Sequence, residues 1–270
     1  MRQKSATLKF KAVRGIELQH GRNEAVSFPP HVHEEFQILV MLDGRLQLTV
    51  SGQDQVVTPP AICPVNPLQV HAGCAKGWGW ECRNFYVPQK IAARLMGAHS
   101  KCAPVFPTPL IHDIALAHRL AVAHKWACED GERSGALIEA VAILFRRYAV
   151  SAHPNGGDCM HPGVQMALLH LRARYVEPIR VQTLARISGL SRFHFLRAFA
   201  RAMGMTPHAY QIQLRLASAV RRLRENAPAA EAAAESGFYD QSHLIRVLRR
   251  SHGLTPAMLK KANRMRNFIQ

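Results

Sequence analysis

Side chains suited to binding a small molecule are concentrated in the first third of the chain. Imidazole, indole, phenol and amide groups combine stacking with hydrogen bonding, which suits a small polar or aromatic ligand. The candidates are His31, His33, Gln37, Asn66, His71, Trp78, Trp80 and Tyr86. Two alternatives stay open: the tryptophans of GWGWE are also typical of a β-structure core, and the histidines could be structural.

A second set of polar side chains lies in the last third of the chain and is basic. Guanidinium and amide groups on one helical face can donate hydrogen bonds to base edges in the major groove of DNA. The set comprises Arg192, Arg197 and Arg201 in one segment and Gln241, His243, Arg246 and Arg250 in another. For any single arginine, a solvated helix face is an equally good interpretation.

The two basic segments are copies of one unit. LARISGLSRFHFLRAFARAMGMTP (184–207) matches AAAESGFYDQSHLIRVLRRSHGLTP (232–256), with one residue inserted in the second turn. Gly189 and Gly237 allow the positive φ that ends a helix, and Ser191 and Asp240 are good N-caps for the next one. Each copy therefore predicts a helix-turn-helix whose second helix faces the major groove.

The tandem units resemble the DNA-binding domain of the AraC-type (arabinose-regulator-like) transcription regulators. The resemblance covers about 160–262 and rests on GLSRFHFLRAF, the Arg215-Leu216-x-x-Ala219 run, GFYDQSHLIRV and the closing Gly-x-Thr-Pro. It implies two recognition helices in successive major-groove segments, held apart by a connecting helix. The DNA contacts it implies are Ser191, Arg192, Phe193, Leu196 and Arg197 in the first helix and Gln241, Ser242, His243 and Arg246 in the second.

The second unit departs from the family pattern. Ala229 and Ala232 stand where the family usually has large aliphatic residues, and Leu248 stands where it usually has an aromatic one. Smaller side chains bury less apolar area. We therefore expect the second unit to be looser than the first.

The N-terminal half has the pattern of a small β-domain followed by helices. RLQLTV (45–50) alternates as a half-buried strand should, and EFQILVML (35–42) reads as a buried strand that ends at the hairpin signal Asp43-Gly44. Helices are expected at 89–97, 111–127 and 134–149. The wide apolar faces of the last two need a covering surface, either the β-domain or a second subunit.

The segments FPPHVHEEFQILVMLDG (28–44) and TPPAICPVNPLQVH, which ends at His71, resemble the small-barrel cupin module found ahead of such DNA-binding domains. Metal cupins place His-x-His, an acid and a distant His as a facial set for Fe, Mn or Zn. Gln37 occupies the acid position here, which weakens such a site. We therefore expect no metal and no cofactor, and an organic effector in the barrel mouth.

Charge and turn-forming residues divide the chain. Residues 161–270 carry a net charge of +13, against +4 for residues 1–160, which favours a nucleic-acid partner. The predicted fold is a two-domain, β plus all-α chain with a cupin-like β-barrel and flanking helices at 1–150. A linker at 151–161 precedes an all-helical domain at 162–270, in which a long helix joins the two helix-turn-helix units.

Composition excludes several classes. The 270 residues are 48% apolar, which is enough for packed cores, and no run reaches the ~18–20 apolar residues of a membrane span. The basic N-terminus lacks the apolar run of a secretory signal. Six cysteines without a CxxC spacing indicate free thiols in a reducing cytoplasm. No nucleophile–base–acid set, phosphate loop or HExxH is present, so we expect no enzyme.

Three functions stay open. The first is an effector-switched transcription regulator that binds double-stranded DNA, dimerises through 111–127 or 134–149 and has RNA polymerase as a candidate partner. The second is a metal-binding cupin, enzyme or metal sensor, that uses His31, His33 and His71. The third is an architectural DNA binder without an effector. Stoichiometric metal would favour the second, and weak sequence preference the third.

Overall fold

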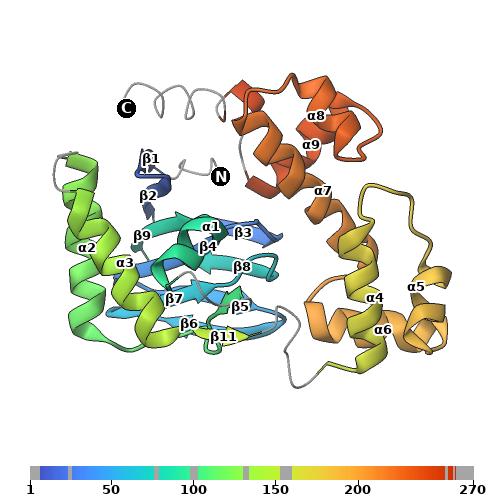
Figure 1. The fold of residues 1–270 in the computed structure, drawn as a ribbon, viewed down its shortest axis with the longest axis horizontal. Helices are drawn as coiled ribbons and strands as arrows, with labels where there is room; N and C mark the ends of the chain where they lie inside the picture. Colours follow the sequence, from blue (N-terminus) through green and yellow to red (C-terminus); the bar gives the residue numbers. More distant parts are fainter. Residues whose placement is uncertain are drawn as a thin grey trace.

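The computed structural model describes residues 7–23, 26–75, 79–97, 103–129, 134–152, 160–252, 255–257 and 259. A β-rich domain with three helices is followed by an all-helical domain, as the sequence predicts (Figure 1). No helix in these ranges is long and apolar enough to cross a membrane.

The β-domain is built from two antiparallel sheets. The first has the order β1 (Thr7–Val13), β2 (Ile16–Asn23), β9 (Trp80–Val87), β4 (Phe36–Gly44) and β7 (Ala61–Val65). The second has the order β3 (Val26–His31), β8 (His71–Ala75), β5 (Leu46–Val50) and β6 (Gln53–Val57). In the part of the chain that the structure describes, these sheets do not close into a single barrel.

Strand β4 shows why the two sheets stack. Its side chains alternate between faces, and both faces are apolar and buried. Leu39 and Met41 join a core shared with the second sheet, whereas Ile38 and Val40 join a core shared with the helices. The sequence correctly predicts a buried strand here.

The predicted hairpin at Asp43-Gly44 is wrong. β4 pairs with β7 and β9, and β5 pairs with β6 and β8, so the chain passes from one sheet to the other at this point. Gly44 has φ +77°, and a Cβ placed there would lie 1.6 Å from the carbonyl oxygen of Gly79. The dipeptide therefore makes a corner between sheets, which needs glycine for the same conformational reason as a hairpin.

Three helices cover the outer face of the first sheet. They are α1 (Gln89–Leu95), α2 (Ile114–Glu129) and α3 (Ser134–Tyr148). Leu120 and Phe145 are fully buried against this sheet, which supplies the covering surface that the helices need. β10 (Ala103–Val105) pairs with β11 (Val150–Ala152) at the end of the domain. The start of the predicted linker thus lies in β11, and residues 153–159 lie outside the described residues.

The helical domain contains the two predicted units. Helix α4 (Pro162–Ala173) packs on unit 1, which consists of α5 (Val181–Ser188) and α6 (Arg192–Met203). The long helix α7 (Pro207–Arg224) leads to unit 2, which consists of α8 (Ala229–Glu235) and α9 (Gln241–His252). Figure 1 shows α4–α6 on the side of the sheets opposite to α2 and α3.

Each unit has its own core. Phe195, Phe199 and Tyr210 form the centre of the first, together with Val32 and Val70 from the β-domain. The second is formed by residues of α7, α8 and α9, and its largest members are Phe238 and several leucines. In the second turn, Gly237 has φ +81° and a Cβ there would lie 2.6 Å from the carbonyl oxygen of Val176, so both conformation and space require glycine.

Candidate functional site

Helix α6 presents a basic, exposed face. The Ser191 hydroxyl accepts a hydrogen bond from the backbone N–H of His194 at 3.4 Å and begins the helix. Because Phe195 and Phe199 are buried, the opposite face is turned to solvent. The predicted DNA contacts Ser191, Arg192, Phe193, Arg197 and Arg201 are exposed there, and Leu196 is half-buried.

Helix α9 repeats this arrangement. The Asp240 carboxylate accepts from the backbone N–H of His243 at 2.6 Å, while Leu244 and Leu248 are buried. Gln241, Ser242, Arg246 and Arg250 are exposed. His243 is only half-buried, and its ring packs edge-on against Phe238 with 5.3 Å between centroids. The two helices therefore offer similar donor sets for base edges and phosphates.

A cavity of about 100 Å³ lies between the β-domain and the helical domain. Its β-domain wall includes Glu17, Gln19, Phe28, His31, Val32, His33, Glu34, Glu35 and Tyr86. Its helical wall includes Ala217, Val220, Arg221, Arg224, Ser251 and Leu259. This volume suits an ion or a very small molecule, because pockets for drug-sized ligands are several times larger.

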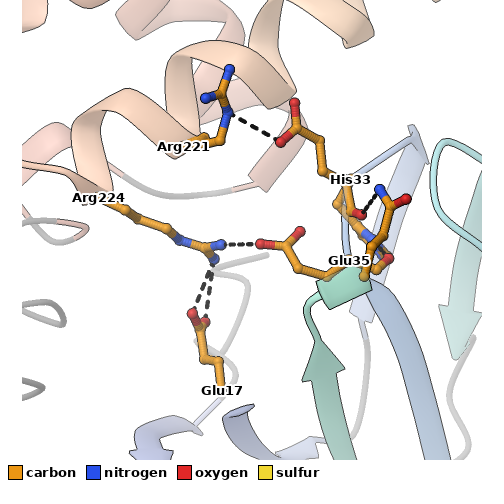
Figure 2. A network of polar contacts seen from close by, with 7 residues as sticks. Glu17, His33, Glu35, Arg221 and Arg224 are labelled. Atoms are coloured by element: carbon orange, nitrogen blue, oxygen red, sulfur yellow. Dashed lines mark hydrogen bonds and ion pairs between the residues drawn. The ribbon is translucent and has the colours of Figure 1, made fainter. Parts of the chain in front are cut away.

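Ion pairs cross this cavity from the end of α7 (Figure 2). The Arg224 guanidinium lies 2.6 Å from a Glu35 carboxylate oxygen and 3.1 Å from one of Glu17. Arg221 lies 3.2 Å from Glu34. We call these three contacts the interdomain latch.

The latch is electrostatically matched. Burial is the largest influence on Glu35 and by itself would raise its pKa, but the charges of Arg224 and His33 and the hydrogen bonds to the carboxylate together lower that pKa. Burial would lower the pKa of Arg224, and the carboxylates of Glu17 and Glu35 outweigh it in turn. Both groups are therefore held in their charged forms, which is the state that attracts.

Three histidines meet beside the latch. His31 ends β3 and is the cross-strand partner of His71 at the start of β8. Their ring centroids are 4.2 Å apart, and the His33 ring lies 4.8 Å from that of His71. Burial, and next the neighbouring His33, lower the pKa of His31 to about 4. His31 is therefore neutral at neutral pH.

The sequence matches the models of two families, one in each domain. The AraC-like ligand binding domain matches residues 14–145, and a helix-turn-helix domain matches residues 184–262. The chain is an AraC-type transcription regulator. It binds DNA through its helix-turn-helix domain and carries an N-terminal effector-sensing domain.

Relatives and solved structures agree with this assignment. An uncharacterised HTH-type transcriptional regulator of Bacillus subtilis, YbfI, is 25% identical over 257 residues, covering 90% of this regulator and 91% of YbfI. An apo variant of ToxT from Vibrio cholerae has the same fold, with a TM-score of 0.56 and 10% identity over 92% of this chain and 99% of that one. Unsaturated fatty acid bound ToxT gives a TM-score of 0.50 and 11% identity, covering 95% of each chain.

The structure separates the regulator's predicted effector residues into two groups. His31, His33 and Tyr86 line the cavity, and Gln37 and His71 contact its histidines. Asn66 instead binds the backbone of Phe106 through its side chain, at 2.9 and 3.0 Å. Trp80 lies in the core between the sheets. Trp78 lies outside the described residues.

Several site residues of the regulator are missing from the sequence-based set. Tyr239, directly before the N-cap of α9, was not predicted and is 93% exposed beside that helix, much as the predicted contact Phe193 of α6 is 76% exposed. The aromatic residue beside the Asp240 cap was the available signal for Tyr239. Glu17, Arg221 and Arg224 carry no local signal, because their partners are far away in the sequence.

Proposed function

We propose that this regulator reads a bipartite DNA site with α6 and α9, and that an effector in the interdomain cavity controls the placement of α9. The observation that carries the proposal is the position of Arg224. This residue ends α7, the helix that joins the two reading units, and it is paired with Glu17 and Glu35 of the sensing domain. An effector that binds the protein better when the latch is open than when it is closed would increase the population of molecules with an open latch. In those molecules, unit 2 would no longer be held against the sensing domain.

The fold is compatible with a small-molecule effector. A ToxT structure contains an unsaturated fatty acid, although the low identity transfers the fold and not that ligand to this regulator. Here the cavity combines three glutamates and two arginines across the domain boundary. A ligand that carries charge can replace one partner of these pairs.

Selection of bound sequences from a random duplex pool at ~150 mM salt tests the reading helices, because non-specific phosphate binding is weak there. We expect two conserved blocks about one helical turn apart. Arg197→Ala should relax one block and Arg246→Ala the other, each at a cost of about 1–3 kcal/mol. Arg119→Ala, on the exposed surface of α2, removes the same charge and should leave both blocks intact. If both test variants keep the wild-type motif, the assignment of the two helices is wrong.

The remaining expectations stay predictions. A homodimer formed through α2 or α3 has two exposed apolar side chains to use, Ile114 and Trp126.

The role of a transcription regulator also leads us to expect RNA polymerase as a partner, the cytoplasm as the location and no catalytic activity. The domain limits 1–150 and 162–270 and the linker between them can be tested by limited proteolysis.

A further inference from the structure

The three histidines beside the latch converge from two paired strands. One ring nitrogen from each of His31, His33 and His71 lies within 4.8 Å of the other two. His31 and His33 are half-buried, and His71 is buried. In the described residues this is the only cluster of three or more His, Cys, Asp or Glu side chains with ligand-like spacing.

The Nδ1 atom of each of the three rings lies near a backbone carbonyl oxygen. His31 Nδ1 lies 2.8 Å from the carbonyl oxygen of Pro29, and His33 Nδ1 lies 2.8 Å from that of Glu35. His71 Nδ1 lies 3.0 Å from the carbonyl oxygen of Gln69. A carbonyl only accepts, so Nδ1 of His31 and His71 carries the proton, and Nε2 of the neutral ring carries the lone pair. His33 differs, because its Nδ1 faces the Glu35 carbonyl and its Nε2 faces the Gln37 amide oxygen, and a neutral ring can donate to only one of them. Donation to a carbonyl behind the ring is also how metal-binding histidines are oriented.

The donor set selects the class of ligand. Neutral imidazoles favour zinc, copper, iron and nickel over magnesium or calcium. Zinc with three histidines keeps a fourth position, which water or another oxygen can occupy. Gln37 Oε1 lies 3.1 Å from His33 Nε2, and Gln37 is itself held by donation to Asn84 Oδ1 at 2.9 Å. Zn–N bonds of about 2.0–2.1 Å place tetrahedral nitrogens about 3.3 Å apart, so nitrogens that now lie up to 4.8 Å apart must approach one another, and His33 Nε2 must exchange its contact with Gln37 for the metal.

The same ion would act on the latch. The three rings contribute no negative charge, so the nearest carboxylates in sequence, Glu34 and Glu35, would balance the ion. Those carboxylates now pair with Arg221 and Arg224. A divalent charge beside them competes with both guanidinium groups.

We propose that His31, His33 and His71 bind a divalent transition-metal ion, with zinc as the expected occupant and Gln37 near its fourth position, and that this ion opens the interdomain latch. The claim that the ion opens the latch rests on the proposed function, because it names the effector of that site. The claim that the histidines bind the ion rests on the geometry of the three rings alone.

Metal binding is tested on the full chain after dialysis against a chelator. Co²⁺ should bind in a one-to-one ratio and give the visible absorption of a low-coordinate site, and Zn²⁺ should displace it. His31→Ala and His71→Ala should weaken binding about 100-fold or more. His118→Ala, at an exposed histidine of α2, should bind like wild type. Wild-type protein that binds no Co²⁺, or equal binding in all variants, would overturn the site.

A ligand exchange covers the case in which His71→Ala fails to fold. His71→Cys keeps a metal ligand at that position and should add a thiolate-to-Co²⁺ charge-transfer band in the near ultraviolet. A histidine with a merely structural role would not produce that band. Its absence in folded, Co²⁺-loaded His71→Cys would contradict the assignment of His71.

DNA affinity with and without Zn²⁺ tests the claim that the ion opens the latch. We expect at least a ~10-fold change at the selected bipartite site in wild type, and a much smaller change in Arg224→Gln, which has already lost two of the three latch contacts. Metal binding without any effect on DNA would overturn the effector role and leave the metal site. A bipartite motif with no metal binding would overturn the metal inference and leave the proposed function.

Discussion

The two helix-turn-helix units share a plan but are attached to the sensing domain by different forces. Unit 1 takes Val32 and Val70 of the β-domain into its own core, and the Tyr210 hydroxyl donates to the carbonyl oxygen of Leu68 at 3.1 Å. The end of α7 beside unit 2 is tied by the ion pairs of Arg221 and Arg224. One attachment is mainly apolar and the other is charged.

Under the proposed function, this difference in attachment decides which unit responds to an effector. Apolar contact is non-directional and does not depend on a particular charge, so a small polar ligand has little to compete for. An ion pair can be exchanged for another charge at the same site. Under the proposed function, unit 1 therefore keeps its position on the sensing domain, and unit 2 is the one whose position an effector changes.

The hydrophobic cores of the two units also differ, and the core of unit 1 has the larger side chains. Phe195, Phe199 and Tyr210 fill the first core with aromatic rings, whereas Ala232 and Ala233 stand in the second beside leucines. Aromatic side chains bury more area and therefore contribute more to the free energy of unfolding. The predicted looseness of unit 2 is compatible with this composition and can be measured.

Truncation of the core should have the largest effect. Phe199→Ala should lower the free energy of unfolding by about 3–5 kcal/mol, because it leaves a cavity in an aromatic core. It should also speed hydrogen exchange at Val32 and Val70, which share that core. Leu248→Ala, the matching change in unit 2, should destabilise α8 and α9 without this effect on the β-domain. Equal exchange at Val32 and Val70 in both variants would remove the proposed asymmetry.

Opening the latch should have an intermediate effect. Arg224→Gln should lower stability by about 1–3 kcal/mol, less than for a fully buried pair because the Arg224 side chain is 22% exposed. Hydrogen exchange should rise in α8 and α9 and stay unchanged in α5 and α6. Arg221→Gln serves as the comparison: this side chain is 49% exposed, and its pair should contribute about 0–1 kcal/mol. Faster exchange in α5 and α6 with Arg224→Gln would show that both units depend on the latch.

Refilling the second core should have the smallest effect. Ala229 is half-buried against that core, so Ala229→Leu should add about 0.5–1 kcal/mol of stability by burying methyl groups. Ala230→Leu, on the exposed side of the same helix, should change stability by less than about 0.5 kcal/mol. Both are read from urea unfolding of the full chain. A destabilised Ala229→Leu would mean that the second core is already filled.

Local patterns explain what could be predicted of the fold. The caps Ser191 and Asp240, the glycine turns and the 3.6-residue spacing of apolar residues all act within a few residues, and each predicted helix is present. The sheet pairing was harder. Asp43-Gly44 has the chemistry of a tight turn, but the same backbone conformation serves a hairpin and a corner between two sheets.

The candidate site shows the same limit. Individual effector residues such as His31, His33 and Tyr86 could be selected by type, and the cavity includes them. Asn66 and Trp80 have equally suitable chemistry but lie in a backbone contact and a core. Residue type alone does not distinguish a ligand-binding side chain from one that is satisfied inside the fold.

The sequence by itself determined helices α6 and α9, the repeat that produces them and the basic charge of the domain that carries them. These features depend on short-range spacing and on composition, which a single chain displays directly. The tertiary structure decided that Glu17 and Glu35 meet Arg224, about 190 to 207 residues further along the chain, and that His31 pairs with His71. Such contacts depend on how whole domains and sheets pack, because burial and long-range charge pairing are set by the three-dimensional fold and leave no local pattern in the sequence.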